Sequence, residues 1–151
     1  MGLEKLGFEP ADLDYILIIH LHGDNFGGVP FILLDFLRKE RVKVLTIIGP
    51  EGIESKTLAL LELLYPDLIN QINQDLLQFI EFHTNKIEDF KDFKLATFEV
   101  LYSPPSLPHA LKLFINDKII AFSGDTEWCK NLICLADEAI LLICECNLVS
   151  N

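Results

Sequence analysis

Apolar residues along the chain fall into short continuous runs, which alternate with segments whose apolar positions follow a helical period. The short runs predict β-strands at Tyr15–Ile19, Val42–Ile48, Gln78–His83, Leu95–Leu101, Ala110–Ile115, Lys118–Phe122 and Ala139–Cys146. The helical segments predict a helix ending near Leu6, one beginning near Pro30, and others at Glu54–Tyr65, Leu68–Leu77 and Glu127–Leu135. Because strands and helices alternate, the pattern favours a mixed α/β class.

Turn residues separate these elements and indicate where regular structure stops. Asn116-Asp117 lies between two apolar runs, a pattern typical of a tight β-hairpin. "YSPPSLP" carries three prolines in seven residues and excludes regular structure, and "TNKIEDFKDFK" predicts a polar turn. There is no repeat, linker or low-complexity segment, so we expect a single domain over residues 1–151.

Composition narrows the class of protein. Hydrophobic residues make up 50% of the 151-residue chain, which excludes a disordered protein. Runs such as Tyr15–Ile19 and Ala139–Ile143 are much shorter than the roughly 18 residues that span a bilayer, and they predict buried strands. Because no secretory or transit segment is apparent, we expect no membrane partner and a cytoplasmic location.

The net charge argues against a nucleic-acid-binding protein, and the spacing of the cysteines argues against a zinc knuckle. A net charge of −11 without a Lys/Arg cluster makes nucleic acid an unfavourable partner, although acidic chains can carry divalent cations. The four cysteines, Cys129, Cys134, Cys144 and Cys146, lack the paired C-x-x-C spacing of a zinc knuckle. We expect reduced thiols.

The stretch "IIHLHGDNFGG" carries the first chemical signal. His20 and His22 point the same way in extended backbone, and Gly23 would let the chain bend so that Asp24 turns toward the same centre. Two neutral imidazoles and a carboxylate suit zinc. A solvated polar loop is the alternative for the histidine pair alone, but the preceding strand, Asp24 and the two glycines favour a metal site.

The stretch "SGDT" carries the second signal. Asp125 follows an apolar strand and precedes a predicted helix, a position where aspartate often acts as an N-cap. Together with the histidine cluster it is instead a candidate bridging ligand, because one carboxylate can span two cations.

These two motifs, in this order, carry a resemblance to a known family. "DYILIIHLHGDNFGGVPFILLDF" resembles the H-x-H-x-D-H segment of the metallo-β-lactamase fold, and "KIIAFSGDTEW" with "LADEAILLICEC" resembles its later aspartate segment. Within this fold the chain resembles the metal-dependent hydrolases near ribonuclease Z rather than the true β-lactamases. The resemblance implies an αββα sandwich, one or two zinc ions at the edge between the sheets, and a metal-bound hydroxide that attacks an ester, amide or phosphodiester.

The resemblance also assigns residues. His20 and His22 match ligands of the first metal, and Asp24 matches a ligand of the second metal that orients the nucleophilic water. Asp125 matches the bridging carboxylate. Glu145 is interpreted as a neighbour of the ligands or a cap, without an assigned role.

The sequence departs from the family pattern at several positions. Asn25 stands where the family has a histidine ligand of the second metal, and Tyr102 stands where it has another. His109, seven residues after Tyr102, either replaces the lost ligand or is an ordinary loop histidine, and His83 is interpreted as structural. The family's first strands and last histidine have no counterpart in residues 1–151, so we expect a fold incomplete at both ends.

Two functional hypotheses follow, and both share this fold. With His20, His22 and Asp125 the first site still reaches three ligands, so at most one zinc is expected. The first hypothesis is a metal-dependent hydrolase acting on a small-molecule or phosphodiester substrate. The second, favoured by Asn25 and Tyr102, is a non-catalytic truncated remnant or binding module, for which a homo-oligomer is expected. An α/β protein whose histidine motif is accidental is a third, weaker class.

Overall fold

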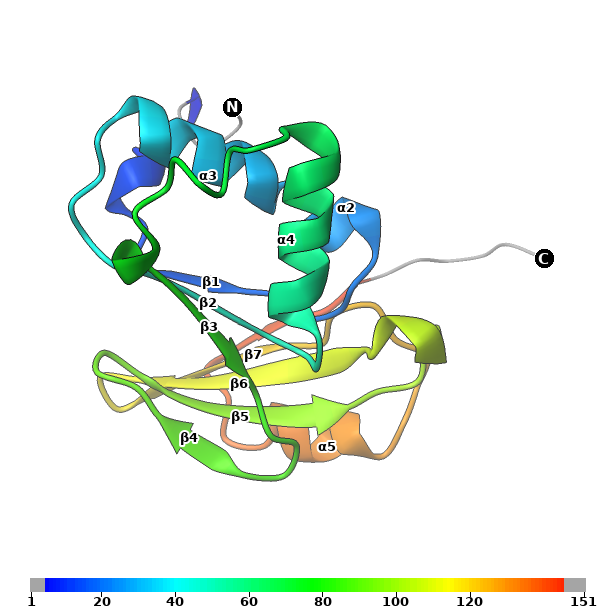
Figure 1. Cartoon of the computed structure of the whole chain (residues 1–151). Coiled ribbons are helices and arrows are strands. Elements are labelled where there is room, and N and C mark those ends of the chain that lie inside the picture. The colour runs from blue at the N-terminus through cyan, green and yellow to red at the C-terminus, as the bar shows by residue number, and fades with distance from the viewer. Residues whose placement is uncertain (1–4, 146–151) are drawn as a thin grey trace. The chain divides into compact units, whose positions relative to one another are not determined.

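The computed structural model describes residues 5–145, which group into two compact units (Figure 1). The first unit extends to Glu81 and the second begins at Phe82. The predicted helix before Leu6 lies almost wholly outside the described residues. No helix among residues 5–145 is long and apolar enough to cross a membrane.

The first unit is a three-stranded parallel sheet with helices after its strands. The strands lie in the order β1-β2-β3, with β1 at Tyr15–Leu17, β2 at Leu45–Gly49 and β3 at Leu77–Glu81. The helices are α2 at Gly23–Phe26, α3 at Val29–Arg38 and α4 at Ile53–Leu64, with short 3-10 turns at Pro10–Asp12 and Gln74–Leu76. The strand predictions of this unit and the helices that contain Pro30 and Glu54 are confirmed to within a few residues.

The core of the first unit explains why β2 has no polar alternation. Every residue of β2 is buried, as expected for the central strand of a parallel sheet. Helices α3 and α4 cover one face of this sheet (Figure 1), and they bury Leu33, Phe36, Ile53 and Leu61. Loss of the side chain at such a position removes both apolar burial and packing.

The predicted helix at Leu68–Leu77 is wrong. The chain there forms turns and a single 3-10 turn, because Asp67 after Pro66 adopts a left-handed conformation with φ of 64°. Asn73 Oδ1 then accepts the Asp75 N–H at 3.1 Å, an interaction that favours turns over helix.

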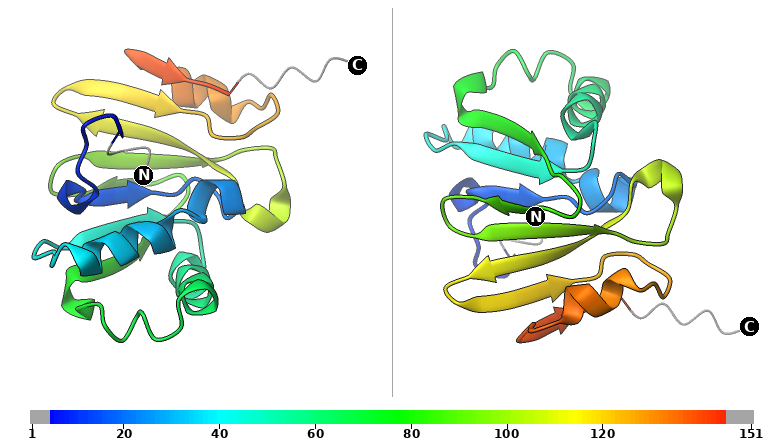
Figure 2. Two further views of the ribbon diagram at one scale, coloured as in Figure 1. Left: turned by 90° about the horizontal axis from the view of Figure 1, so that it is seen from above. Right: turned by 90° about the horizontal axis from the view of Figure 1, so that it is seen from below.

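The second unit is a five-stranded sheet with one covering helix (Figure 2). The strands lie in the order β4-β5-β6-β7-β8, at Ile87–Asp89, Lys94–Glu99, His109–Ile115, Lys118–Phe122 and Leu141–Ile143. All neighbours are antiparallel except β7 and β8, which are parallel and joined through α5 at Asn131–Ala136. A 3-10 turn at Pro104–Ser106 occupies the proline-rich stretch.

Two turn predictions in this unit have different outcomes. Asn116 and Asp117 both have positive φ, 48° and 60°, which confirms the predicted hairpin. The segment "TNKIEDFKDFK" was expected to be a turn throughout, but it contains β4, whose Ile87 faces Ala96 of β5. A three-residue edge strand has too little apolar alternation to be found by pattern.

The core of the second unit lies between its sheet and α5. Val100, Ala110, Ala121 and Leu135 form a buried cluster there. Lys112 of β6 is also buried, and its Nζ donates to the carbonyls of Cys134 at 3.0 Å and Asp137 at 2.6 Å. This ammonium group therefore caps the C-terminal end of α5, where carbonyl groups carry partial negative charge.

The last strand differs from its prediction. Ala139–Cys146 was expected to be buried, but Leu141, Leu142 and Ile143 of β8 are 43–48% exposed. In residues 5–145, β8 pairs with β7 alone and is an edge strand. Cys146 lies outside the described residues, while Cys129, Cys134 and Cys144 are free thiols, as predicted.

Candidate metal centre

The segment after β1 places the candidate ligands at the carboxyl end of a parallel strand. Ile18, Ile19 and Leu21 are buried and anchor the chain, and a helical turn follows them. The turn begins at His22, whose carbonyl accepts the N–H groups of Asn25 at 3.0 Å and Phe26 at 3.1 Å. This single helical turn, α2, reverses the chain and returns Asp24 toward the histidines.

The glycine that this turn requires is Gly27 rather than Gly23. A Cβ atom on Gly27 would lie 2.2 Å from the Gly23 carbonyl oxygen, a clash with backbone that cannot be relieved by rotating a side chain. Gly23 has no neighbour within 4 Å of such an atom, and its φ is not positive. The expectation that Gly23 supplies the bend is therefore wrong, because an ordinary helical turn supplies it.

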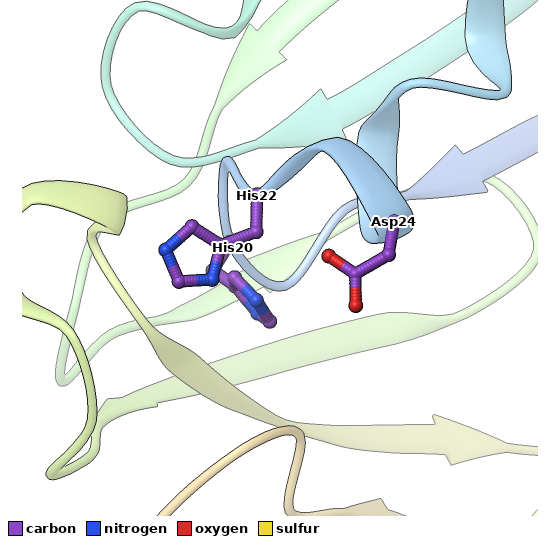
Figure 3. Close-up of side chains that lie close together, drawn as sticks. All are labelled: His20, His22 and Asp24. Atoms are coloured by element: carbon purple, nitrogen blue, oxygen red, sulfur yellow. The ribbon is translucent and has the colours of Figure 1, made fainter.

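His20, His22 and Asp24 come together on one side of this turn (Figure 3). One potential ligand atom from each residue lies within 4.8 Å of the other two. The two imidazole rings stand edge to face, with centroids 4.9 Å apart and planes at 85°. His20 is fully buried, His22 is half-buried and Asp24 is exposed, so the cluster extends from the core to the solvent.

This donor set fits a zinc ion. Ligand atoms on a tetrahedral zinc with bonds of about 2.0–2.1 Å lie roughly 3.3 Å apart, so the three ligand atoms, which lie within 4.8 Å of one another, must move closer together when one ion binds. Two imidazole nitrogens and one carboxylate oxygen form the three-ligand set that catalytic zinc sites use. Among residues 5–145, no other group of three His, Cys, Asp or Glu side chains lies close enough to hold an ion.

Asn25, the residue that replaces a family histidine, contacts the same cluster. Its side-chain Nδ2 lies 3.1 Å from Nε2 of His20 in a partly buried position. Sequence reasoning missed this contact, although a five-residue separation across one helical turn is the signal that could have found it.

Asp125 lies in the second unit, in the loop that follows β7. It is not the N-cap of a helix, because α5 begins only at Asn131 with Lys130 as its N-cap. The loop turns at Gly124, whose φ is 60°, a conformation that favours glycine. The alternative that Asp125 merely caps a helix is therefore excluded, and its assignment as a metal ligand stays a prediction.

Long-range hydrogen bonds hold the residues on both sides of Asp125. Glu145 accepts the Thr126 N–H through Oε1 at 2.9 Å, and its own N–H donates to the Ser123 hydroxyl at 3.3 Å. Glu127 N–H donates to the Leu101 carbonyl at 2.7 Å. Glu145 thus caps the loop that carries Asp125, which agrees with its interpretation as a cap, although no local sequence pattern identifies the group that it caps.

The remaining predicted positions of the second unit also have defined surroundings. Tyr102 follows Leu101, whose bridge to Glu127 places Tyr102 beside the loop that carries Asp125. His109 begins β6, where its Nδ1–H donates to the Leu107 carbonyl at 2.7 Å. Its ring also packs edge to face on Phe82, with centroids 4.7 Å apart.

Burial lowers the pKa of His109, an effect that its hydrogen bond to the Leu107 carbonyl and the charge of Glu99 only partly oppose. The structure thus gives His109 a role in packing within its own unit. His83 Nδ1 lies 2.9 Å from Oε1 of Glu88, whose other carboxylate oxygen accepts the His83 N–H at 3.1 Å. These contacts agree with the structural interpretation of His83.

Comparison with known proteins adds a family to this geometry. The family model of the anti-Pycsar protein Apyc1 matches residues 1–151. A ribonuclease Z of Nanoarchaeum equitans is 32% identical over 110 residues, which is 73% of this chain and 33% of that protein. A ribonuclease BN of Escherichia coli is 48% identical over 46 residues, 30% of this chain and 15% of that protein. The chain spans about a third of the length of the ribonuclease Z relatives that match most of it.

Solved structures show the same fold. The metallo-β-lactamase fold protein YhfI from Bacillus subtilis superposes with a TM-score of 0.75 at 20% identity, covering 97% of this chain and 56% of that one. The short form of human tRNase Z gives 0.67 at 21% identity, covering 93% and 60%. Zn²⁺-bound PqqB from Methylobacterium extorquens gives 0.61 at 14% identity, covering 87% and 41%.

These similarities confirm the predicted fold class, an α/β metallo-β-lactamase-like fold with two sheets. The chain is a metallo-β-lactamase fold protein that belongs to the anti-Pycsar protein Apyc1 family and is related to ribonuclease Z over most of its length.

Proposed function

We propose that this chain is a zinc-dependent hydrolase of phosphodiester bonds, with His20, His22 and Asp24 as its metal ligands. The observation that carries the proposal is the convergence of these three side chains within 4.8 Å at the end of a parallel strand. The relatives support the bond class, because ribonucleases cleave phosphodiester bonds.

Each residue of the cluster has a chemical task in this proposal. His20 and His22 offer neutral imidazole nitrogens, and the burial of His20 fixes its position. Asp24 is exposed, so its carboxylate can reach both an ion and a water molecule and can accept a proton from that water. Bound zinc would supply a water of lowered pKa, and thus a nucleophile near neutral pH. Asp125 is proposed as a further ligand, shared if a second cation binds.

The substrate that we propose is a small phosphodiester rather than a long nucleic acid. The net charge of −11 repels a polyanion over its whole length, whereas a small substrate presents few charges. Neutralisation by the bound metal can offset those few charges.

The alternative is a non-catalytic binding module that keeps the fold. The contact between Asn25 and His20 favours it, because a ligand position of the family has become a hydrogen-bonding position. The exposed apolar side chains of β8 are consistent with the homo-oligomer proposed for this alternative.

Metal content and turnover of the full chain separate these functions. We expect about one zinc per chain in the wild-type protein purified without chelator, measured by elemental analysis. His20→Ala should lose it. His83→Ala is the matched control and should keep it, since His83 is bonded to Glu88 in the other unit.

Hydrolysis of bis(p-nitrophenyl) phosphate then tests the chemistry. Zinc-dependent turnover that is lost in His20→Ala and in Asp24→Asn, but kept in His83→Ala, would establish the hydrolase. Zinc without turnover would support the binding module, and absence of zinc from the wild-type chain would overturn the metal site itself.

A further inference from the structure

The contact between Asn25 and His20 lies at the centre of the candidate metal site and has no counterpart in the family pattern. The Asn25 side-chain amide approaches Nε2 of His20 at 3.1 Å. An amide NH₂ group can only donate, so Nε2 accepts this hydrogen bond with its lone pair. If the amide is rotated by 180°, Nε2–H donates to Oδ1 instead, and Nε2 is again engaged.

Helix α2 places the side-chain amide of Asn25 beside the imidazole ring of His20. Asn25 lies in α2, where its N–H donates to the His22 carbonyl at 3.0 Å. Gly27 admits the close approach of the Gly23 carbonyl that keeps this turn tight. Because the contact is partly buried, water competes with it less than it would at the surface.

The two nitrogens of His20 are not equivalent toward an incoming ion. The whole His20 ring is fully buried, so burial does not distinguish its two nitrogens, but Nδ1 is the ring nitrogen next to the side chain's attachment to the backbone. Nε2 lies at the far end of the ring, where it contacts the side-chain amide of Asn25 in α2. An imidazole nitrogen has one lone pair, so Nε2 cannot accept the Asn25 hydrogen bond and bind a metal ion at the same time.

We propose that Asn25 is a positioning residue that competes with zinc for Nε2 of His20 and weakens metal binding in this chain. The inference rests on the proposed function and adds a regulatory feature to its site. In the metal-free chain Asn25 holds His20 in one orientation. Metal binding must break this hydrogen bond, whose contribution then opposes binding.

The size of the effect follows from the strength of one neutral hydrogen bond. Its removal should tighten zinc binding about 3- to 10-fold, because the bond exists only in the metal-free state. A residue that supported the metal, as a ligand or as an outer hydrogen-bonding partner, would have the opposite effect when removed.

The experiment uses the full chain as wild type, Asn25→Ala and Asn25→Leu. The leucine variant keeps the branched shape of the asparagine side chain at a larger volume, so agreement between the two variants guards against an effect of the cavity that alanine leaves. Asn131→Ala is the matched control, since Asn131 Nδ2 donates to the Glu99 carbonyl at 2.8 Å in the second unit. Zinc affinity is measured by competition with a chromophoric chelator, and the tautomer of metal-free His20 by ¹⁵N NMR of its ring.

We expect tighter zinc binding in both Asn25 variants and unchanged binding in Asn131→Ala. We also expect a single His20 tautomer in the wild type that becomes a mixture in the variants. Equal or weaker zinc binding in both Asn25 variants would overturn the inference while the proposed function stands. A wild-type ring with the same tautomer mixture as the variants would also overturn it. Failure of every form to bind zinc would overturn the proposed function, and the inference with it.

Discussion

The two candidate ligand regions of this protein are held in place by different means. His20, His22 and Asp24 come from one continuous segment, which a single helical turn folds back on itself. Asp125 lies in a loop whose neighbours Thr126 and Glu127 are held by residues far away in sequence, Thr126 by Glu145 and Glu127 by Leu101. The positions of His20, His22 and Asp24 therefore depend mainly on local structure. The position of Asp125 depends instead on long-range contacts within the second unit.

The largest expected effects test whether each region depends on its own core. Leu33 of the first unit and Leu135 of the second are both fully buried, so replacement of either by alanine should cost about 2–5 kcal/mol of stability. We expect Leu33→Ala to weaken zinc binding and Leu135→Ala to leave it within about twofold at temperatures where both variants are folded. Urea unfolding gives the stabilities, and chelator competition gives the affinities. Equal loss of zinc affinity in both variants would show that the first site is not locally determined.

A smaller effect should follow from removing the ammonium group that caps α5. Lys112→Met keeps most of the apolar stem but leaves the carbonyls of Cys134 and Asp137 without their donor. We expect a loss of about 1.5–3 kcal/mol, because these hydrogen bonds are made by a charged donor and lie in a largely buried place. Hydrogen exchange should show faster exchange in α5 and β8 while the amides of β2 are unaffected. Lys118→Met, on the exposed end of β7, is the control.

Features that depend on neighbouring residues could be predicted from the sequence, whereas most of those that depend on distant residues could not. The pair His20 and His22, with Asp24, could be predicted because strand, spacing and turn are all local. The hairpin at Asn116-Asp117 was predictable for the same reason. Asparagine and aspartate favour the positive φ that a two-residue turn requires, and both residues adopt it. The loss of helix at Leu68–Leu77 was not, because an apolar period survives there although Pro66 and Asp67 favour a turn.

What the sequence could not indicate is long-range pairing. The role of Glu145 requires β8 to lie beside β7, and the exposure of β8 depends on which strands flank it. The family pattern likewise does not predict the contact between Asn25 and His20, because it indicates only that a histidine ligand is lost at position 25.

The capping role of Glu145 gives a local prediction about the loop that carries Asp125. Glu145→Ala removes the acceptor of the Thr126 N–H, so this amide should exchange with solvent several-fold faster. The measurement is amide hydrogen exchange by NMR, with Glu138→Ala as an exposed acidic control in the same unit. Unchanged exchange at Thr126 would mean that the loop is held by its other contacts alone, such as the hydrogen bond from Glu127 to Leu101.

The smallest expected effect is the response of the second unit to acid through His109. Burial lowers the pKa of His109 below its ordinary value, so the unfolded chain takes up a proton at higher pH than the folded chain does. Stability should therefore be unaffected by this group well above pH 6.5 and should fall as the pH drops from about 6.5 toward the lowered folded-state pKa. His109→Gln cannot be protonated, so its stability should decline less over that range, as measured by urea unfolding at pH 8 and pH 5.5. His83→Gln is the control on an exposed histidine, and a decline as small in it as in His109→Gln would show that the acid response does not come from the buried ring.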